Sequence, residues 1–291
     1  MSSASLSSNT CQRPGCGKPA PLKCASCKCV DYCSRDCQTS TWKKHKQLCK
    51  AVTSSLKSNS SPCLILDGMG ALGSNDINTK PIVNELKSAH SDVPVSVVHL
   101  DDGFTAPQQI ATALEKGNFS ACIILGWGSG DEDFGLDFAK SLVFREALVS
   151  WVKKGGRLIV QGERISHAAG DWPEWFDLNW KSHDYCRSIH DLNTSHWFQE
   201  AAVAHPKMDV KASLVKHVEP QDNLYGPPDG AVTLSSVPGY CGKVVSAGQS
   251  AFTLAKYGDG TVSYFGDVNA EKVTIETVGI IATGFIRIQQ I

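Results

Sequence analysis

Eight cysteine and histidine residues near the start of this 291-residue chain have the side chains and the spacing of zinc ligands. Their pattern is C-x4-C-x7-C-x2-C-x5-C-x3-C-x7-H-x3-C, and the residues are Cys11, Cys16, Cys24, Cys27, Cys33, Cys37, His45 and Cys49. A structural Zn²⁺ ion takes four such ligands in a tetrahedron, so eight ligands fill two sites. His45 and Cys49 are separated by about one helical turn, which favours a shared ion. We therefore predict two Zn²⁺ ions at residues 11–49.

The spacing alone leaves two ways to divide these ligands between the two ions. Sequential pairing gives the sets Cys11/Cys16/Cys24/Cys27 and Cys33/Cys37/His45/Cys49. Cross-braced pairing gives the sets Cys11/Cys16/Cys33/Cys37 and Cys24/Cys27/His45/Cys49. One further thiol, Cys29, lies among the ligands, and we interpret it as a bystander rather than a competing ligand.

Residues around the ligands resemble the MYND-type zinc finger. They are the Tyr32-Cys33 pair, the Cys37-Gln38 pair and the W-x2-HK-x2-C run that starts at Trp42. This resemblance implies the cross-braced pairing, and it implies a groove for short proline-containing peptides near Gln38 and Trp42. Those two residues are four apart, so on a helix they share one face. The expected partner is therefore a protein with a short proline-containing motif.

The first residues and the cysteine content indicate the compartment. The opening MSSASLSSNT lacks the apolar stretch of a secretory signal, and no apolar run reaches the roughly 20 residues of a membrane span. We expect a cytoplasmic or nuclear protein without membrane contact. In those compartments clustered cysteines bind metal more often than they form disulfides.

The charge is unevenly distributed between the cysteine-rich segment and the rest. Residues 11–50 carry nine basic and two acidic residues, a formal +7, and the whole chain is −1, so the remainder is −8. Seven thiolates and two Zn²⁺ ions would reduce the charge of this segment to +4. That modest charge, without a recognisable base-reading helix, does not favour nucleic-acid binding.

The remaining sequence alternates short apolar runs with amphipathic stretches. The runs that we expect to be buried strands are residues 63–68, 95–100, 121–128 and 156–162. The stretches that we expect to be helices are residues 79–90, 106–116, 137–154 and 270–287. This alternation predicts an α/β fold of the flavodoxin-like, three-layer type, with a parallel sheet covered on both faces. Residues 251–267 indicate a hairpin, and residues 163–240 are predicted to be an irregular insertion.

Composition also suggests where the parts of the chain begin and end. We expect a disordered tail at 1–10, the zinc finger at 11–49, a flexible Ser-rich linker at 50–62 and the α/β domain at 63–291. A flexible linker implies that the finger and the α/β domain fold separately.

The strand order, the KKGGRLIV element and the YGDGTVSYFGD hairpin resemble the class I glutamine-amidotransferase-like fold, in particular its ThuA-like branch. This resemblance implies a cysteine nucleophile in the sharp turn after residues 156–162. Here Glu163 stands in that turn, so no thiolate is available there for amidotransfer. Whether the domain is an enzyme at all is left open, and the absent nucleophile argues against it.

Three polar residues are candidates for a pocket in the α/β domain. Glu163 and His167 are four apart and follow a predicted strand, and Asp67 lies at the end of the first predicted strand. In parallel sheets, ligands bind at the carboxyl ends of the strands, where all three residues are expected.

Taken together, the sequence predicts an adaptor or regulatory protein. Its zinc finger binds a proline-containing peptide, and its amidotransferase-like domain is not catalytic. The alternative is a small-molecule hydrolase or isomerase that works in the cleft of the α/β domain and is localised by the finger.

Overall fold

The structure is a computed structural model. It describes residues 10–58, 60, 62–68, 79–89, 91–100, 107–125, 140–161, 172–198, 205–234, 242–246 and 248–284. The predicted tail at 1–10 lies, apart from Thr10, outside the described residues. Within the described ranges no helix is long and apolar enough to cross a membrane.

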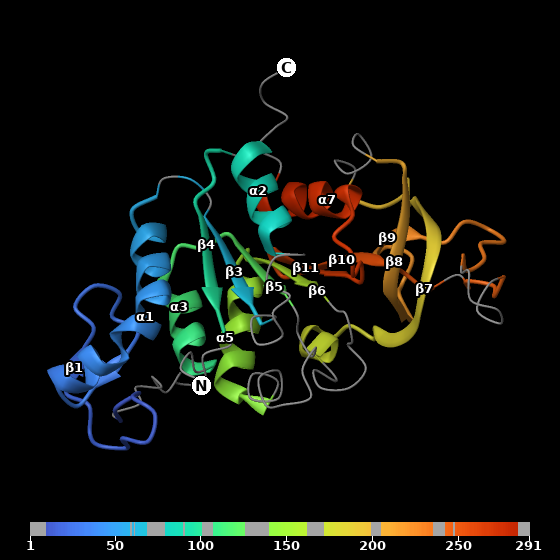
Figure 1. Cartoon of the computed structure of the whole chain (residues 1–291). Coiled ribbons are helices and arrows are strands. Elements are labelled where there is room, and N and C mark those ends of the chain that lie inside the picture. The colour runs from blue at the N-terminus through green and yellow to red at the C-terminus, as the bar shows by residue number, and fades with distance from the viewer. Residues whose placement is uncertain are drawn as a thin grey trace.

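The N-terminal part consists of a two-stranded antiparallel ladder and one long helix (Figure 1). These elements are β1 (Leu22–Lys23), β2 (Asp31–Tyr32) and α1 (Arg35–Ser55). Helix α1 begins after Ser34, whose side-chain oxygen accepts a hydrogen bond from the backbone N–H of Cys37 and caps the helix. The ladder and the helix hold the segments that carry the predicted zinc ligands.

Helix α1 extends beyond the predicted zinc finger. It continues to Ser55, so the predicted flexible linker at 50–62 is wrong for residues 50–55. The reason is packing, because Ala51, Val52 and Ser55 are buried on one side of the helix. Burial of these side chains stabilises helical structure in a segment whose serine content suggested a linker.

A nine-stranded mixed sheet forms the centre of the rest of the described chain (Figure 1). Its strands are β3 (Cys63–Asp67), β4 (Val95–His99), β5 (Ala121–Leu125), β6 (Arg157–Gln161), β7 (Lys181–Leu192), β8 (Lys207–Lys216), β9 (Asn223–Gly226), β10 (Phe252–Tyr257) and β11 (Gly260–Phe265). Their spatial order is β4-β3-β5-β6-β11-β10-β9-β7-β8. Neighbours from β4 to β11 are parallel, and neighbours from β11 to β8 are antiparallel. The predicted α/β fold is confirmed, but the prediction of a parallel sheet is wrong for the second half.

The antiparallel half lies largely in the segment 163–240, which was predicted to be irregular. Strand β8 alternates exposed and buried residues along its first half, as a strand with one covered face does. On its outer edge, Ser213 N donates to Gly266 O and Val215 N donates to Ser250 O. The described part of this segment therefore consists largely of regular strands rather than an irregular insertion.

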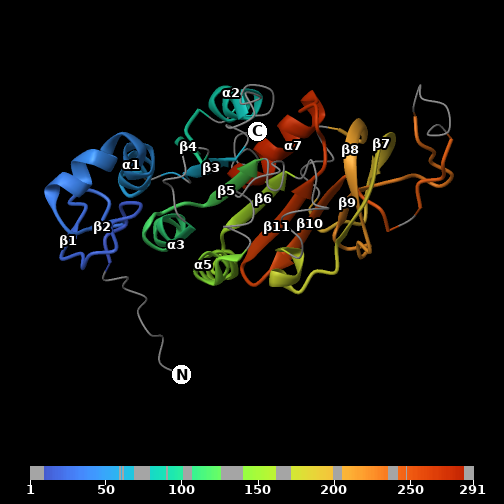
Figure 2. The same ribbon diagram turned by 60° about the horizontal axis from the view of Figure 1, so that its bottom comes forward.

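Helices cover both faces of the parallel half (Figure 2). They are α2 (Thr79–Ala89), α3 (Pro107–Lys116), α5 (Leu142–Lys153) and α7 (Lys272–Thr283), and a 3-10 turn, η2 (Trp172–Phe176), follows β6. Apolar residues of α3 and α5 pack in one buried cluster, and those of α2 and α7 pack in another on the opposite face. The predicted helices are confirmed within the described residues.

Helix α1 packs against α3 and the edge strand β4 (Figures 1 and 2). Leu48, Ala51 and Val52 of α1 belong to the same buried cluster as Val98 of β4 and Ile110 of α3. We call this contact, defined by these five residues, the α1 seam. The seam contradicts the expectation of two parts joined only by a flexible linker, because one helix belongs to both.

Hydrogen bonds between the finger and the α/β part accompany the seam. They run from His99 N to Gln47 Oε1 (3.2 Å), from Asn118 N to Ser55 Oγ (3.2 Å) and from Lys116 Nζ to Lys28 O (2.6 Å). Two of the three involve α1 itself, so the polar contacts fix the same helix that the apolar cluster buries.

Candidate metal centre

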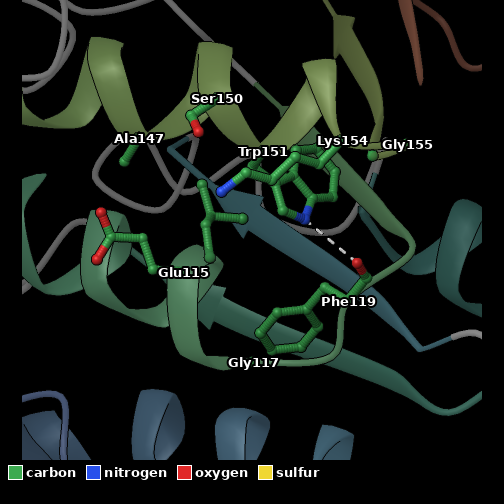
Figure 3. Close-up of a pocket in the computed structure, with 10 residues that line it drawn as sticks. Glu115, Gly117, Phe119, Ala147, Ser150, Trp151, Lys154 and Gly155 are labelled. Carbon is green, nitrogen blue, oxygen red and sulfur yellow. Dashed lines mark hydrogen bonds between the residues drawn. The ribbon is translucent and has the colours of Figure 1, made fainter. Parts of the chain in front are cut away.

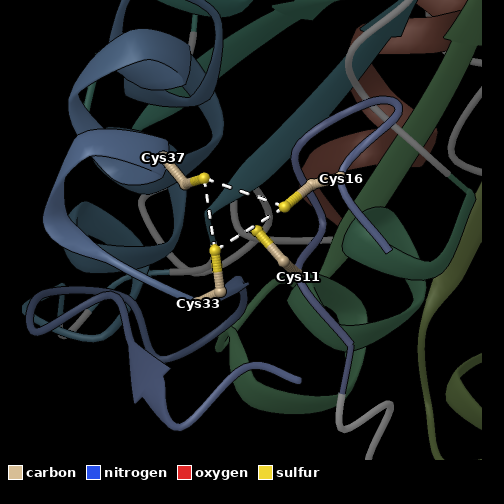
Figure 4. A group of neighbouring side chains, drawn as sticks. All are labelled: Cys11, Cys16, Cys33 and Cys37. Atoms are coloured by element: carbon tan, nitrogen blue, oxygen red, sulfur yellow. Dashed lines mark hydrogen bonds between the residues drawn. The ribbon is translucent and has the colours of Figure 1, made fainter. Parts of the chain in front are cut away.

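The first ligand cluster gathers Cys11, Cys16, Cys33 and Cys37 from separate segments (Figure 4). Cys37 lies in the first turn of α1, Cys33 follows β2, and the other two precede β1. The Sγ–Sγ distances are 3.6 Å for Cys16–Cys33, 3.9 Å for Cys16–Cys37 and 3.3 Å for Cys33–Cys37. A tetrahedral zinc ion with Zn–S bonds of about 2.3 Å requires sulfur atoms about 3.8 Å apart. The cluster therefore fits one zinc ion.

Arg13 favours the charged form of one ligand in this cluster. Its Nη1 atom donates to Cys37 Sγ at 3.7 Å and lowers the pKa of that thiol to about 6. The thiolate is the form that binds metal. Cys37 in turn raises the pKa of Cys33 to about 12, so the binding of Zn²⁺ must release the proton of Cys33.

The second cluster consists of Cys24, Cys27, His45 and Cys49, and all four are buried. The Sγ atoms of Cys24 and Cys49 are 3.8 Å apart, and Cys27 Sγ lies 3.4 Å from His45 Nε2. His45 and Cys49 are one turn apart on α1, which places both on the side that faces the cluster. These distances match a tetrahedral site with three sulfur ligands and one imidazole.

Cys29 is buried but belongs to neither cluster. Its Sγ donates to Cys27 O at 3.2 Å, and its backbone N–H donates to Cys27 Sγ at 3.4 Å. The hydrogen bond from Cys29 lowers the pKa of Cys27 to about 3, and Cys27 raises the pKa of Cys29. Cys29 thus favours the thiolate form of a ligand without being one, in agreement with the prediction.

The two clusters decide the pairing that the spacing left open. Each combines ligands from the first and the second half of the motif, so the cross-braced pairing is confirmed and the sequential alternative is wrong. The cysteines in both clusters are free rather than joined in disulfides. Eight donors in two tetrahedral sets hold two zinc ions, whose role in such closed sites is structural.

The two residues predicted to bind a peptide lie on the exposed side of α1. Gln38 is half-buried, and Trp42 is 39% exposed. The indole of Trp42 lies edge-on to the ring of His45, with centroids 5.9 Å apart. Trp42 is therefore an exposed aromatic side chain that rests directly on a zinc ligand.

One of the three predicted pocket residues is described by the structure. Asp67 ends β3 and is fully buried, and its Oδ2 lies 2.9 Å from Nδ1 of His99. Glu163 and His167 lie outside the described residues, so their grouping with Asp67 stays a prediction. His99 was not predicted, although it ends the next strand along the chain and is the register partner of Asp67.

A cavity of about 270 Å³ lies between α3 and α5 (Figure 3). Asp67 lies at the other end of the parallel strands. Trp151 and Phe119 line the cavity, and Trp151 Nε1 donates to the backbone carbonyl of Phe119 at 3.2 Å. Glu115 and Lys154 also line the cavity. It lies beside the amino ends of β5 and β6, whereas ligands of parallel sheets bind at the carboxyl ends.

Comparison with curated proteins finds similarity over short stretches of this chain, 31 to 60 residues long. Ubiquitin carboxyl-terminal hydrolase 19 of Arabidopsis thaliana is 50% identical over 48 residues, 16% of this chain and 7% of that protein. A SET and MYND domain-containing protein of Dictyostelium discoideum is 58% identical over 31 residues, 11% and 6% of the two chains. Tudor domain-containing protein 1 of Mus musculus is 42% identical over 60 residues, 20% and 5%. The chain thus spans less than a tenth of these relatives.

Comparison with solved structures finds distant similarity over most of this chain. A ThuA-like protein from Bacteroides uniformis aligns with 77% of this chain and 90% of its own, with 11% identity and a TM-score of 0.45. A β-galactosidase from Bacillus circulans sp. alkalophilus aligns with 86% of this chain and 34% of its own, with 12% identity and a TM-score of 0.42. Both TM-scores are too low to establish a shared fold.

The family model named MYND finger matches residues 8–49. That range contains all eight ligands and both clusters. Residues 8–49 of this chain are therefore a MYND finger that holds two zinc ions.

Proposed function

We propose that the finger is a protein-interaction module that binds short proline-containing peptides through Gln38 and Trp42. The observation that carries the proposal is the exposed indole of Trp42 next to the zinc ligand His45. An aromatic side chain on a rigid support loses little entropy on binding, and such residues dominate interface energetics. Zinc provides the rigid support here because it fixes the imidazole on which the indole rests.

Replacing Trp42 with alanine should weaken the binding of a proline-rich peptide by about 2 kcal/mol, roughly thirtyfold. Gln38→Ala should also weaken binding, because the amide would no longer contact the peptide backbone. Affinity is measured by calorimetry with a panel of proline-rich peptides, and the zinc content should stay at two ions per chain.

The matched control for Trp42→Ala is Lys43→Ala, the exposed neighbour that points about 100° away around the same helix. It should leave affinity and zinc content unchanged. Equal peptide affinity for the parent chain, Trp42→Ala and Gln38→Ala would rule out this binding site.

We further propose that the α/β part has the flavodoxin-like arrangement of amidotransferase-like domains without their chemistry. The parallel strands β4-β3-β5-β6-β11, numbered along the chain, have the order 2-1-3-4-5, and this supports the proposal. Burial disfavours the thiolate form of the three cysteines that the structure describes in this part, because it also raises the pKa of the half-buried Cys186. Cys63 and Cys122 are fully buried, and burial raises the pKa of Cys63 to about 12 and that of Cys122 well above its usual value.

We expect no release of ammonia from glutamine by the zinc-loaded chain, because Glu163 occupies the position of the nucleophile. The assay is glutamate-dehydrogenase-coupled detection of ammonia. Serine variants of Cys63, Cys122, Cys186 and Cys241 should behave as the parent chain does. The proposal would be contradicted if the parent chain turned over glutamine and one of these four variants did not.

A further inference from the structure

A buried aspartate and a half-exposed histidine form a pair at the carboxyl edge of the parallel sheet. Asp67 is the last residue of β3, and His99 is the last residue of β4. The carboxylate is fully buried, the imidazole side chain is 38% exposed, and Asp67 Oδ2 is 2.9 Å from His99 Nδ1. We propose that Asp67 and His99 are an acid–base pair, in which His99 Nε2 removes the proton of water or of a small hydroxyl-bearing substrate.

The contact with Asp67 determines which nitrogen of His99 is the base. An ionised carboxylate can only accept hydrogen bonds, so the proton of the neutral imidazole lies on Nδ1. Nε2 then carries the lone pair. A carboxylate that holds the ring in this tautomer also stabilises the imidazolium that forms when Nε2 takes up a proton.

The fold places this pair at the carboxyl ends of two parallel strands, beside the switch point of the sheet. From β3 the chain continues to β4 on one side of β3, and it later returns as β5 on the other side. Asp67 thus borders the switch point between β3 and β5, where the direction of strand order reverses, and His99 lies one strand further out on β4. Ligands bind in the crevice at the carboxyl ends of strands next to such a point.

Regular structure holds both residues in position. Asp67 and His99 are register partners in the ladder between β3 and β4. Leu100 N donates to Asp67 O at 2.9 Å, and His99 N donates to Gln47 Oε1 of α1 at 3.2 Å. A side chain of the finger helix therefore fixes the backbone of the base, which makes Gln47 a positioning residue.

Two other histidine–carboxylate pairs among the described residues lack this combination. His183 and Asp184 lie 3.8 Å apart on β7, and the Asp184 side chain is 61% exposed. His205 contacts Glu276 of α7, and both side chains are 26% exposed. Neither pair lies at the carboxyl ends of the parallel strands. Asp67 and His99 combine a fully buried carboxylate with a position at the carboxyl ends of the parallel strands.

Hydrolysis of p-nitrophenyl acetate tests the base without knowledge of the natural substrate. In this reaction Nε2 would accept a proton from water while the water oxygen adds to the acetyl carbon. The bond from that carbon to the phenol oxygen then breaks, and the proton leaves Nε2, so that acetic acid and nitrophenol are the products. This chemistry goes beyond peptide binding by the finger and does not depend on it.

The zinc-loaded full chain and its variants are compared in this assay. His99→Asn should lower the turnover rate by about tenfold or more, because a positioned base contributes on the order of a hundredfold. Asp67→Asn should lower it as well, since an amide no longer selects the tautomer. His183→Asn is the matched control, with a partly exposed imidazole beside a carboxylate, and it should leave the rate unchanged. The proposal would be overturned if the parent chain hydrolysed p-nitrophenyl acetate no faster than the His99→Asn variant does.

Chemical labelling of the parent chain guards against variants that fold poorly. Diethyl pyrocarbonate acylates the free nitrogen of neutral imidazoles, and peptide mass spectrometry locates the label. Loss of turnover should follow labelling of His99, and hydroxylamine, which removes the label, should restore turnover. Labelled His99 with full turnover would refute its role as the base. Gln47→Ala should reduce turnover while both zinc ions stay bound, and unchanged turnover would refute its positioning role.

Discussion

Removing zinc from the full chain should unfold the finger and also lower the thermal stability of the α/β part. Structural zinc contributes on the order of 10 kcal/mol of folding free energy per ion in small fingers. The ligands His45 and Cys49 lie on α1, on either side of Gln47 and Leu48, which contact the α/β part. Loss of the metal therefore removes the constraint on a helix that both parts share.

A strong chelator, calorimetry and amide exchange measure this effect. The chelator should release two zinc ions per chain, remove exchange protection from α1 and lower the transition temperature of the α/β part. His45→Ala empties the second site and should reproduce most of the shift. Cys16→Ser empties the first site, which lies at the N-terminal end of α1, away from the residues that contact the α/β part. It should therefore cause a smaller shift of the transition temperature. An unchanged transition of the α/β part after chelation would mean that the two parts fold separately.

Replacing Val52 with aspartate should destabilise the chain by about 4 kcal/mol or more while both zinc sites stay loaded. Val52 is fully buried in the α1 seam, and burying an unpaired carboxylate is among the costliest single changes. For a protein of this size, that cost corresponds to a decrease in the transition temperature on the order of 10 °C. Val52 is not a ligand, so metal content should not change.

Lys50→Asp is the matched control, because it introduces the same residue at an exposed position of the same helix. Surface substitutions of this kind change stability by about 0.5 kcal/mol at most. Scanning calorimetry and zinc analysis of both variants separate packing from metal binding. If both variants melted at the temperature of the parent chain, α1 would contribute little to the stability of the α/β part.

The zinc finger and the parallel strands could be predicted from the sequence. The ligands lie within 39 residues, and cysteine and histidine are the residue types that zinc prefers. The pairing of the ligands came from the resemblance to the MYND finger and was confirmed by the two clusters. Strands such as β3 and β5 are buried on both faces, so their apolar runs stand out in the sequence.

The hairpin predicted at residues 251–267 is confirmed by β10 and β11, but the strands β7, β8 and β9 were missed because their composition is mixed. Strand β7 places exposed residues such as Tyr185 and Ile189 beside the buried His190, and this pattern does not follow a simple apolar alternation. Its pairing with β8 and β9 depends on segments far apart in the chain. Such contacts leave no local signal in the sequence.

Two features of the site depend on tertiary structure alone. The Ser-rich segment after Cys49 looked like a linker, yet residues 50–55 are helical because they pack on α3 and β4. Asp67 and His99 are 32 residues apart, and only the register of β3 against β4 brings their side chains together. The sequence by itself thus determined the metal chemistry, because zinc selects ligand types and local spacing. The structure decided the seam and the acid–base pair, because both arise from contacts between elements that are distant in the chain.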